Sequence, residues 1–297
     1  MSTSHTEPVI EPIIDWYETH ARDLPWRAAS ATPWGVLVSE IMLQQTPVAR
    51  VLPVWGEWMR RWPTPAALAA EPSGEAVRAW GRLGYPRRAL RLHATATAIV
   101  ERHGGEVPSS HDELLALPGI GTYTAAAVAS FAYRQRHAVL DTNVRRVLAR
   151  LCSGTEHPPK TQSRDEVRLA ESLLPLDPPT AARWSVAVME LGALVCTARS
   201  PRCVDCPVIA RCAWQAAGRP AYDGPPRRGQ TYAGTDRQCR GRLLAVLRDA
   251  EGPVEKAALD VVWSEAVQRE RALDALIADG LVDPLDDGRY ALPGHTA

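Results

Sequence analysis

Four closely spaced cysteines are the strongest candidates for chemistry in this sequence. They form the pattern C-x6-C-x2-C-x5-C, which comprises Cys196, Cys203, Cys206 and Cys212. Thiolates are soft metal ligands, so such clustering indicates a metal before it indicates disulfide bonds. Structural zinc sites usually pair two C-x2-C knuckles, and this stretch contains one. The spacing predicts an iron-sulfur cubane with one thiolate per iron, and zinc stays as the alternative.

Glu40 is a candidate acid on a predicted helix. It lies in WGVLVSEIMLQQT, where the helical repeat places its carboxyl group on the apolar face that also carries Val36 and Leu43. Burial destabilises a charged carboxylate and would raise its pKa toward neutrality, as a general acid working near neutral pH requires. A structural acid paired with a buried arginine or a backbone group is the alternative.

Asp141 is a second candidate carboxylate, in HAVLDTNVRRVLARL. An aspartate directly before a helical pattern is typical of an N-cap, and a capping carboxylate is also held rigidly enough to face a developing cation. At roughly 4 Å and an effective dielectric constant near 20, these charges attract by about 4 kcal/mol, close to a thousandfold in rate. Asn143 follows in the first turn of the same helix.

Gly119 and Gly121 lie in LPGIGTYTAAAVASFAY, directly before another predicted helix. Glycine lets the backbone approach a phosphate closely, and a helix N-terminus offers unpaired N–H groups. Together with Pro118 and the helix before it, the pattern favours a helix-hairpin-helix phosphate clamp. A plain connector between two helices has the same features.

The elements that must position these residues are predicted to be helices, because apolar residues recur with a helical period between proline and glycine breaks. We expect residues 1–217 to form one all-α domain that ends in the cysteine loop. Its predicted helices lie at residues 8–20, from 34 onward, and at 48–62, 65–70, 75–80, 87–103, 112–117, 122–133, 142–151, 163–174 and 181–194.

A second, smaller domain is predicted after a linker at residues 218–235, which are rich in Gly, Pro and Arg and have no hydrophobic period. Residues 236–297 predict a winged-helix-like module. It would contain three helices, at 236–250, 253–263 and 264–279, and two strands around the Asp-Gly turn of LVDPLDDGRYALP. No convincing strand is predicted before residue 280.

Charge differs between these domains, although 34 Lys and Arg balance 34 Asp and Glu overall. Residues 231–297 hold 8 basic and 12 acidic residues, which leaves 26 and 22 in the preceding part. Arg199, Arg202 and Arg211 give the cysteine loop a positive edge that suits a DNA backbone. Because neither a signal-peptide pattern nor an apolar run of roughly 18 to 20 residues is found, we expect a cytoplasmic protein without a membrane partner.

In this order, these signals resemble the MutY adenine glycosylases and, more broadly, the endonuclease III superfamily. The resemblance covers about residues 8–216 and rests on the motifs SEIMLQQT, LGY, LPGIGTYTA, VLDTNVRRVLAR and MELGALVC. It implies two helical lobes with a base-binding cleft between them, and a [4Fe-4S] cluster. It also implies a monomeric, nucleoid-associated enzyme that acts on double-stranded DNA carrying adenine opposite 8-oxoguanine or guanine.

The resemblance also implies roles for the candidate residues. Glu40 would protonate the adenine ring and Asp141 would stabilise the oxocarbenium-like sugar, with Asn143 and Tyr123 supporting them. Because glycosylases extrude the target base, further residues would contact DNA: Gln44, Gln45 and Tyr85 at the gap or the opposite base, Trp26 and Arg27 at the adenine pocket, and Gly119 and Gly121 at the backbone.

The sequence departs from the family pattern in three places. Pro86 follows Tyr85 where a second tyrosine is common, Trp184-Ser185-Val186 replaces the usual Phe-Asn-Gln or Phe-Asn-Glu, and the chain beyond residue 236 is shorter than a Nudix-like domain. A thymine or uracil glycosylase acting at G·T or G·U mismatches is the nearest alternative, because such enzymes share the cluster, the hairpin and a tyrosine before the second helix. The paired Gln44 and Gln45 in SEIMLQQT favour the adenine enzyme. A non-catalytic iron-sulfur DNA-binding protein is the alternative from another class, and retention of both Glu40 and Asp141 argues against it.

A monofunctional enzyme without strand-cutting activity is expected. Bifunctional relatives use a lysine amine after the hairpin, in the position that Tyr123 occupies here, and a phenol cannot form a Schiff base. The two lysines of this sequence, Lys160 and Lys256, lie far from that position along the chain.

Overall fold

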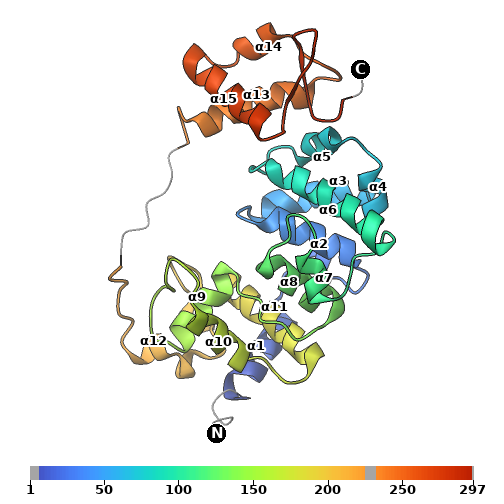
Figure 1. The fold of residues 1–297 in the computed structure, drawn as a ribbon. Coiled ribbons are helices and arrows are strands. Elements are labelled where there is room, and N and C mark those ends of the chain that lie inside the picture. Colours follow the sequence, from blue (N-terminus) through green and yellow to red (C-terminus); the bar gives the residue numbers. More distant parts are fainter. Residues whose placement is uncertain (1–6, 225–231, 296–297) are drawn as a thin grey trace. The chain divides into compact units, whose positions relative to one another are not determined.

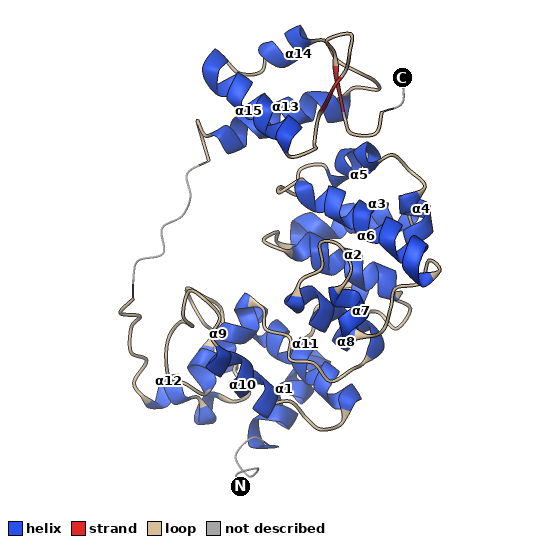
Figure 2. Ribbon diagram, in the orientation of Figure 1, coloured by secondary structure: helices blue, strands red, loops and turns tan. Residues whose placement is uncertain are grey.

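The computed structural model describes residues 7–224 and 232–295, and helices dominate it (Figure 1). The chain divides into two compact units, each of which is discontinuous in sequence. Unit 1 comprises Met1–Val36, Ser109–Leu115 and Gly121–Pro226, and unit 2 comprises Leu37–Pro108, Ala116–Ile120 and Arg227–Ala297. The predicted all-α class is confirmed, and Figure 2 shows that the strands of the described residues are confined to the C-terminal part.

Unit 1 is built around α11, which packs against both α1 and α9. Ile13 of α1, Val147 of α9 and Leu191 of α11 are buried in the same apolar core. The elements of this unit are α1 (Glu7–His20), η1 (Pro25–Arg27), α7 (His111–Leu115), α8 (Thr122–Tyr133), α9 (Thr142–Leu151), α10 (Arg164–Ser172), α11 (Pro178–Leu194), η2 (Cys203–Asp205), η3 (Ile209–Arg211) and α12 (Ala213–Ala216).

Local sequence signals set where several of these helices begin. The Ser163 hydroxyl accepts from the Glu166 N–H while the Glu166 carboxylate accepts from the Ser163 N–H, so a capping box starts α10. Asp177 caps α11 by accepting from the Thr180 N–H, and Pro178 follows at the first helical position, where no N–H is needed. Such short-range rules explain why most predicted helices lie close to their observed bounds.

Unit 2 contains a helical part and the C-terminal module. Its helical part consists of α2 (Pro33–Leu43), whose first residues belong to unit 1, α3 (Val48–Arg61), α4 (Pro65–Ala69), α5 (Ser73–Trp80) and α6 (Arg87–His103). Helices α4 and α5 pack on α6. Trp58 lies at the centre of an edge-to-face cluster, with its ring centroid 4.8 Å from that of Trp62 and 5.6 Å from that of Trp80.

The C-terminal module consists of α13 (Asp236–Asp249), α14 (Lys256–Asp260), α15 (Ala266–Ala278), β1 (Asp283–Pro284) and β2 (Tyr290–Ala291). The strands are antiparallel, with Pro284 opposite Tyr290. The predicted helix at 253–263 is wrong in extent, because Val254 forms a bridge with Tyr290 through hydrogen bonds of 2.8 and 2.9 Å. Extended backbone therefore occurs before residue 280, and the helix starts only after this bridge.

Two arginines join the module to α5 within unit 2. Arg78 of α5 donates to the carbonyls of Arg248 and Ala250, which belong to the C-terminal end of α13. In return Arg248 donates to the Val77 carbonyl over 3.0 Å. Next to this pair, the Gly74 N–H donates to the Pro293 carbonyl over 2.7 Å, and a Cβ at position 74 would lie 2.6 Å from that oxygen.

The predicted linker lies only partly within the described residues. Its first part is held to unit 1, because the Trp214 indole donates to the Pro220 carbonyl and the Tyr222 N–H donates to the Glu156 carboxylate over 2.7 Å. Residues 225–231 lie outside the described residues. Among those that are described, no helix combines the length and the apolar character needed to cross a bilayer.

Candidate active site and cysteine loop

Glu40 is buried on α2, as the helical repeat predicts, with only 6% of its surface exposed. Ser39 and Met42, on either side of it, are fully buried. The acid therefore belongs to unit 2 and is held by a helix whose neighbouring side chains cannot move without disturbing the core.

Tyr85, Gln44 and Gln45 lie on two turns of unit 2 that present them to solvent. Tyr85 is 48% exposed, so it is not a core residue. Gln45 is exposed and Gln44 is half-buried. Both Gln45 (φ 56°) and Tyr85 (φ 49°) adopt left-handed backbone conformations, which are uncommon for residues other than glycine. The residues that sequence analysis assigns to DNA contact thus include two with unusual backbone geometry.

Asp141 is the N-cap of α9, as predicted. One carboxylate oxygen accepts from the Val144 N–H over 2.6 Å, and the other accepts from the Asn143 side-chain amide over 2.7 Å. Burial raises the pKa of this carboxyl, while the hydrogen bonds from Val144 and Asn143 and the charge of Arg146 act in the opposite direction. The carboxylate is thus fixed at both oxygens in a partly desolvated place.

Arg146 connects this carboxylate to the start of the cysteine loop. Its guanidinium donates to the Asn143 side-chain oxygen over 2.9 Å, to the Gly192 carbonyl over 2.6 Å and to the Cys196 carbonyl over 2.7 Å. Glycine is needed at position 192, because a Cβ there would lie 2.7 Å from the Asn143 Cβ. The close approach of α11 to α9 therefore fixes Asn143, which in turn fixes Asp141.

The glycine turn before α8 also has the predicted form. Gly119 has φ 80°, and a Cβ there would meet the Arg91 side chain at 2.9 Å. Gly121 is exposed, stands at the N-cap of α8 and has nothing within 4 Å of a built Cβ. Tyr123 follows in the first turn of α8 and packs against the small core cluster of that helix.

A fully buried carboxylate that sequence analysis missed, Glu190 of α11, anchors the turn that carries Trp26 and Arg27. Arg22 binds it through its backbone N–H and through two guanidinium hydrogen bonds of 2.7 Å, and Arg27 forms an ion pair with it at 2.9 Å. Burial alone would raise the pKa of Glu190, but the Arg22 hydrogen bonds and the Arg27 charge lower it overall. Glu190 stands in the apolar run VAVMELGALV, which is the same signal that identified Glu40.

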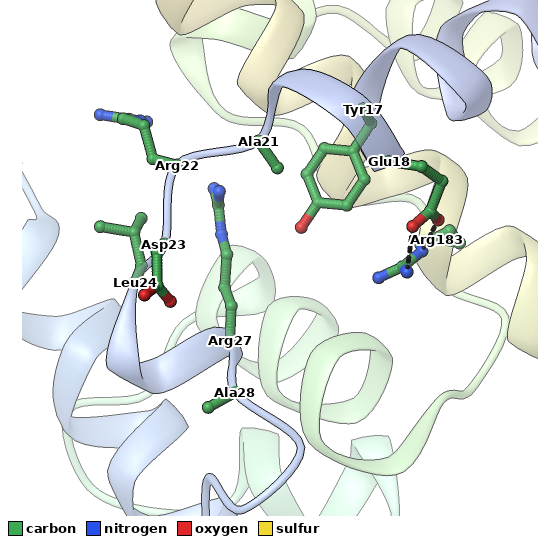
Figure 3. Close-up of a pocket in the computed structure, with 9 residues that line it drawn as sticks. All are labelled: Tyr17, Glu18, Ala21, Arg22, Asp23, Leu24, Arg27, Ala28 and Arg183. Atoms are coloured by element: carbon green, nitrogen blue, oxygen red, sulfur yellow. Dashed lines mark hydrogen bonds and ion pairs between the residues drawn. The ribbon is translucent and has the colours of Figure 1, made fainter.

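A cavity of about 170 Å³ borders this anchor in unit 1. Figure 3 shows Tyr17 in its wall, with Arg27 on one side and the bound pair of Glu18 and Arg183 on the other. The guanidinium carbons of Arg27 and Arg183 lie 5.9 and 5.1 Å from the Tyr17 ring centroid. Arg27 thus faces both a carboxylate and an aromatic ring, and the neighbouring Trp26 is buried.

The four candidate ligand cysteines form no disulfide bonds, and three of them act electrostatically on the fourth, Cys206. Burial and the neighbouring thiols of Cys196, Cys212 and Cys203 raise the pKa of Cys206 to about 11. Within residues 7–224 and 232–295, no three His, Cys, Asp or Glu side chains form a site for a single metal ion.

Arg150 of α9 lies beneath this loop and is only 1% exposed. Its guanidinium donates to the Cys196 sulfur over 3.4 Å and to the Thr197 carbonyl over 2.8 Å, and lies 4.7 Å from the Trp214 ring centroid. A buried cation beside thiolate ligands offsets their negative charge. The three arginines predicted to face DNA, Arg199, Arg202 and Arg211, are all exposed.

Comparisons with known proteins agree on one family. Residues 38–171 match the model described as HhH-GPD superfamily base excision DNA repair protein. The adenine DNA glycosylase of Mycobacterium tuberculosis is 57% identical over 285 residues, which covers 95% of this chain and 93% of that protein. The thymine/uracil-DNA glycosylase of Pyrobaculum aerophilum is 37% identical over 203 residues, covering 67% of this chain and 87% of that protein.

A solved structure supports the fold independently. The trapped endonuclease III–DNA covalent intermediate superposes with a TM-score of 0.62 at 22% identity, covering 73% of this chain and 99% of that chain. This likeness extends to nearly the whole of endonuclease III, so the predicted superfamily fold is confirmed.

Proposed function

Because the chain belongs to the adenine DNA glycosylases of the HhH-GPD superfamily of base excision DNA repair proteins, we propose that it excises adenine mispaired with 8-oxoguanine or guanine. The observation that carries the proposal is the placement of two carboxyl groups: Glu40 is buried on α2, and both oxygens of Asp141 are fixed by hydrogen bonds at the start of α9. An acid and an anion are what hydrolysis of an N-glycosidic bond requires.

In the proposed reaction, the Glu40 carboxyl donates its proton to a ring nitrogen of adenine. The bond between the sugar C1′ and the base then breaks, and its electron pair leaves with adenine. Asp141 stabilises the positive charge that remains on the sugar, until water adds at C1′ and releases a proton. Asn143 keeps Asp141 in position, and Tyr123 supports the same site.

The four cysteines are proposed to hold a [4Fe-4S] cluster, which supplies a rigid negatively charged centre to this loop when bound. Four soft donors in one short loop, with a buried arginine at the sulfur of Cys196, fit such a group. Iron and sulfide contents of four each per chain are expected, and stoichiometric zinc without iron would reject the cluster.

Single-turnover excision assays on four duplexes test the substrate. The four duplexes contain A·8-oxoguanine, A·G, T·G and U·G. We expect excision of adenine from the first two and no excision from the T·G and U·G duplexes. Release of thymine or uracil instead would favour the alternative glycosylase. Tight mispair binding without release of any base would favour the non-catalytic DNA-binding protein.

Glu40→Gln and Asp141→Asn test the two roles. Each should abolish excision and leave mispair binding largely intact, because both groups act on charge that develops in the transition state. Either variant excising at the parental rate would show that its role is misassigned.

The pH dependence gives a second test of Asp141. Excision needs the ionised carboxylate, so the rate should fall on acidification through its raised pKa, above the ordinary value of about 3.9. The same shift means that the native state binds this proton more readily than the unfolded chain. The stability of the parent relative to Asp141→Asn should therefore decrease as the pH rises through that pKa.

We also propose that the enzyme is monofunctional and releases the base without cutting the strand. Position 123 carries a phenol, which cannot form a Schiff base with the opened sugar. Borohydride should therefore trap no stoichiometric protein–DNA adduct, and an adduct formed at the rate of base excision would refute this proposal.

A further inference from the structure

Arg88 of α6 is a buried arginine that the proposed reaction does not use. It is 6% exposed, yet its guanidinium makes hydrogen bonds with oxygens from two separate turns. Burial lowers its pKa to about 10, opposed by the nearby Tyr85. A cation in such a place is costly unless its donors are satisfied, so the contacts that it makes are informative.

The first set of contacts lies at the C-terminal end of α2. One guanidinium nitrogen donates to the carbonyls of Ile41 over 2.9 Å, Met42 over 3.0 Å and Gln44. The last carbonyls of a helix have no partners within it and carry partial negative charge, so a cation there completes the helix end. Arg88 thereby fixes the point where the chain leaves α2 and enters Gln44 and Gln45.

The second set joins that end to the turn before α6. A second guanidinium nitrogen, Nη2, donates to the Thr46 hydroxyl over 2.9 Å and to the Gly84 carbonyl over 3.0 Å. The Thr46 hydroxyl in turn donates to the Leu83 carbonyl over 3.2 Å. The guanidinium carbon also lies 5.5 Å from the Tyr85 ring centroid. One side chain therefore holds both turns.

These two turns are the ones with unusual backbone conformations. Gln45 and Tyr85 both have positive φ, and residues of this kind keep such a conformation only where their surroundings impose it. Arg88 contacts the residue before Gln45, the residue after it, and both the carbonyl before Tyr85 and the Tyr85 ring. It is thus the side chain best placed to impose both conformations together.

We propose that Arg88 is a positioning residue that locks Gln44, Gln45 and Tyr85 into one preformed surface for engaging DNA at the mispair. The proposal rests on the proposed function for the identity of the DNA, and adds a residue that acts on it only through others. It requires that loss of Arg88 weakens lesion engagement far more than it slows excision from the bound complex.

Arg88→Met and Arg88→Lys test this with two readouts. In the free protein, amide hydrogen exchange should rise in residues 44–46 and 83–86 together for Arg88→Met, without any need for activity. With A·8-oxoguanine duplex, KM and Kd should rise about tenfold or more, while the single-turnover rate at saturating enzyme stays within about threefold. Arg88→Lys should restore only part of the protection from exchange and of the affinity for the duplex, because one ammonium group cannot reach both turns.

Arg248→Met is the matched control, because Arg248 is another arginine of unit 2 that donates to a main-chain carbonyl and whose pKa burial lowers to about 10. It should lower thermal stability without changing exchange at 44–46 or KM. A double-mutant cycle with Tyr85→Ala adds specificity: Arg88→Met should lose most of its effect on KM in that background.

The outcomes separate the two proposals. If the parent fails to excise adenine, the proposed function fails, and hydrogen exchange alone decides the role of Arg88. If the parent excises adenine but Arg88→Met leaves both turns protected and KM unchanged, or if its effect adds fully to that of Tyr85→Ala, the positioning role is refuted.

Discussion

The cysteine loop and the C-terminal module are both attached to helices by arginines that bind main-chain carbonyls. Arg146 and Arg150 hold the loop through the carbonyls of residues 196–198. Arg78 and Arg248 hold the module through the end of α13 and the Val77 carbonyl. Hydrogen bonds from arginine side chains to main-chain carbonyls therefore hold both segments, each of which follows the central helices in the sequence.

The two segments differ in what they bury. Within residues 196–212, all of which the structure describes, Val208 is the one hydrophobic side chain that is buried apart from the half-buried cysteines, and Val204 is 89% exposed. The module has an apolar core of its own, which includes Leu243, Leu244, Leu247, Leu259, Leu273, Leu276, Leu281 and Val282. Arginine anchoring can orient a segment, but the loop needs a further source of stability that the module already has.

Removing a cluster ligand should have the largest effect. Cys203→Ser should lose iron, open residues 197–211 to proteolysis and strongly weaken DNA binding, because little apolar burial remains to hold the loop. Limited proteolysis with iron analysis would measure this. Cys152→Ser is the control, since Cys152 is exposed and lies outside the four-cysteine pattern. Full iron content and a protease-resistant loop in Cys203→Ser would show that the loop, like the module, is stable without this ligand.

Arg150→Met should have the next largest effect. It leaves the Thr197 and Ala198 carbonyls without their charged donor, which we expect to cost about 2–4 kcal/mol in the free energy of unfolding of unit 1. Iron should also be lost faster to a chelator. Arg211→Met removes an exposed arginine of the same loop, and it should change neither the free energy of unfolding nor the rate of iron loss. Iron release at the parental rate would show that the loop does not depend on Arg150.

Truncation after Gly234 should have a smaller effect on catalysis. The module is acidic, and its contacts with α5 are made by Arg78, Arg248 and Gly74. The shortened chain should be less stable but should keep most of its discrimination between A·8-oxoguanine and A·G. Comparing single-turnover rates on both duplexes checks this, and near-complete loss of discrimination would assign the reading of the opposite base to the module.

Gly74→Ala should have the smallest effect on stability. It should destabilise the full chain but stabilise a chain that lacks the C-terminal module. In the full chain the new Cβ would lie 2.6 Å from the Pro293 carbonyl oxygen, so melting should occur at a lower temperature. In the chain truncated after Gly234 that oxygen is gone, and alanine should stabilise α5 by up to about 1 kcal/mol. Destabilisation of equal size in both chains would mean that the contact of residue 74 with the module is unimportant.

The sequence predicts those parts of the site that depend on neighbours along the chain. Asp141 could be identified as an N-cap because its partner, the Val144 N–H, lies three residues away, and Glu40 as buried because helical periodicity is local. The anchor between Arg22 and Glu190 could not be predicted, since it joins residues 168 positions apart. The bridge from Val254 to Tyr290 was missed for the same reason.

The sequence likewise identified Tyr85 and Gln45 but not the residue that shapes them. Nothing in the local pattern distinguishes Arg88 from Arg87, its exposed neighbour at the start of α6. The difference arises only when α2 ends beside α6, which brings several unpaired carbonyls to one guanidinium. Tertiary contacts between helices, and not helix propensity, determine this part of the site.

The distance in sequence between Arg22 and Glu190 also constrains how the protein is made. Ribosomes add roughly 5–20 residues per second, so α1 emerges about ten to thirty seconds before the helix against which it packs. During that interval the chain between them can form contacts of unit 2, but the hydrophobic face of α1 lacks its main native partner, α11. Unit 1 is therefore completed late in synthesis, and the nascent chain has an exposed apolar segment that chaperones can bind.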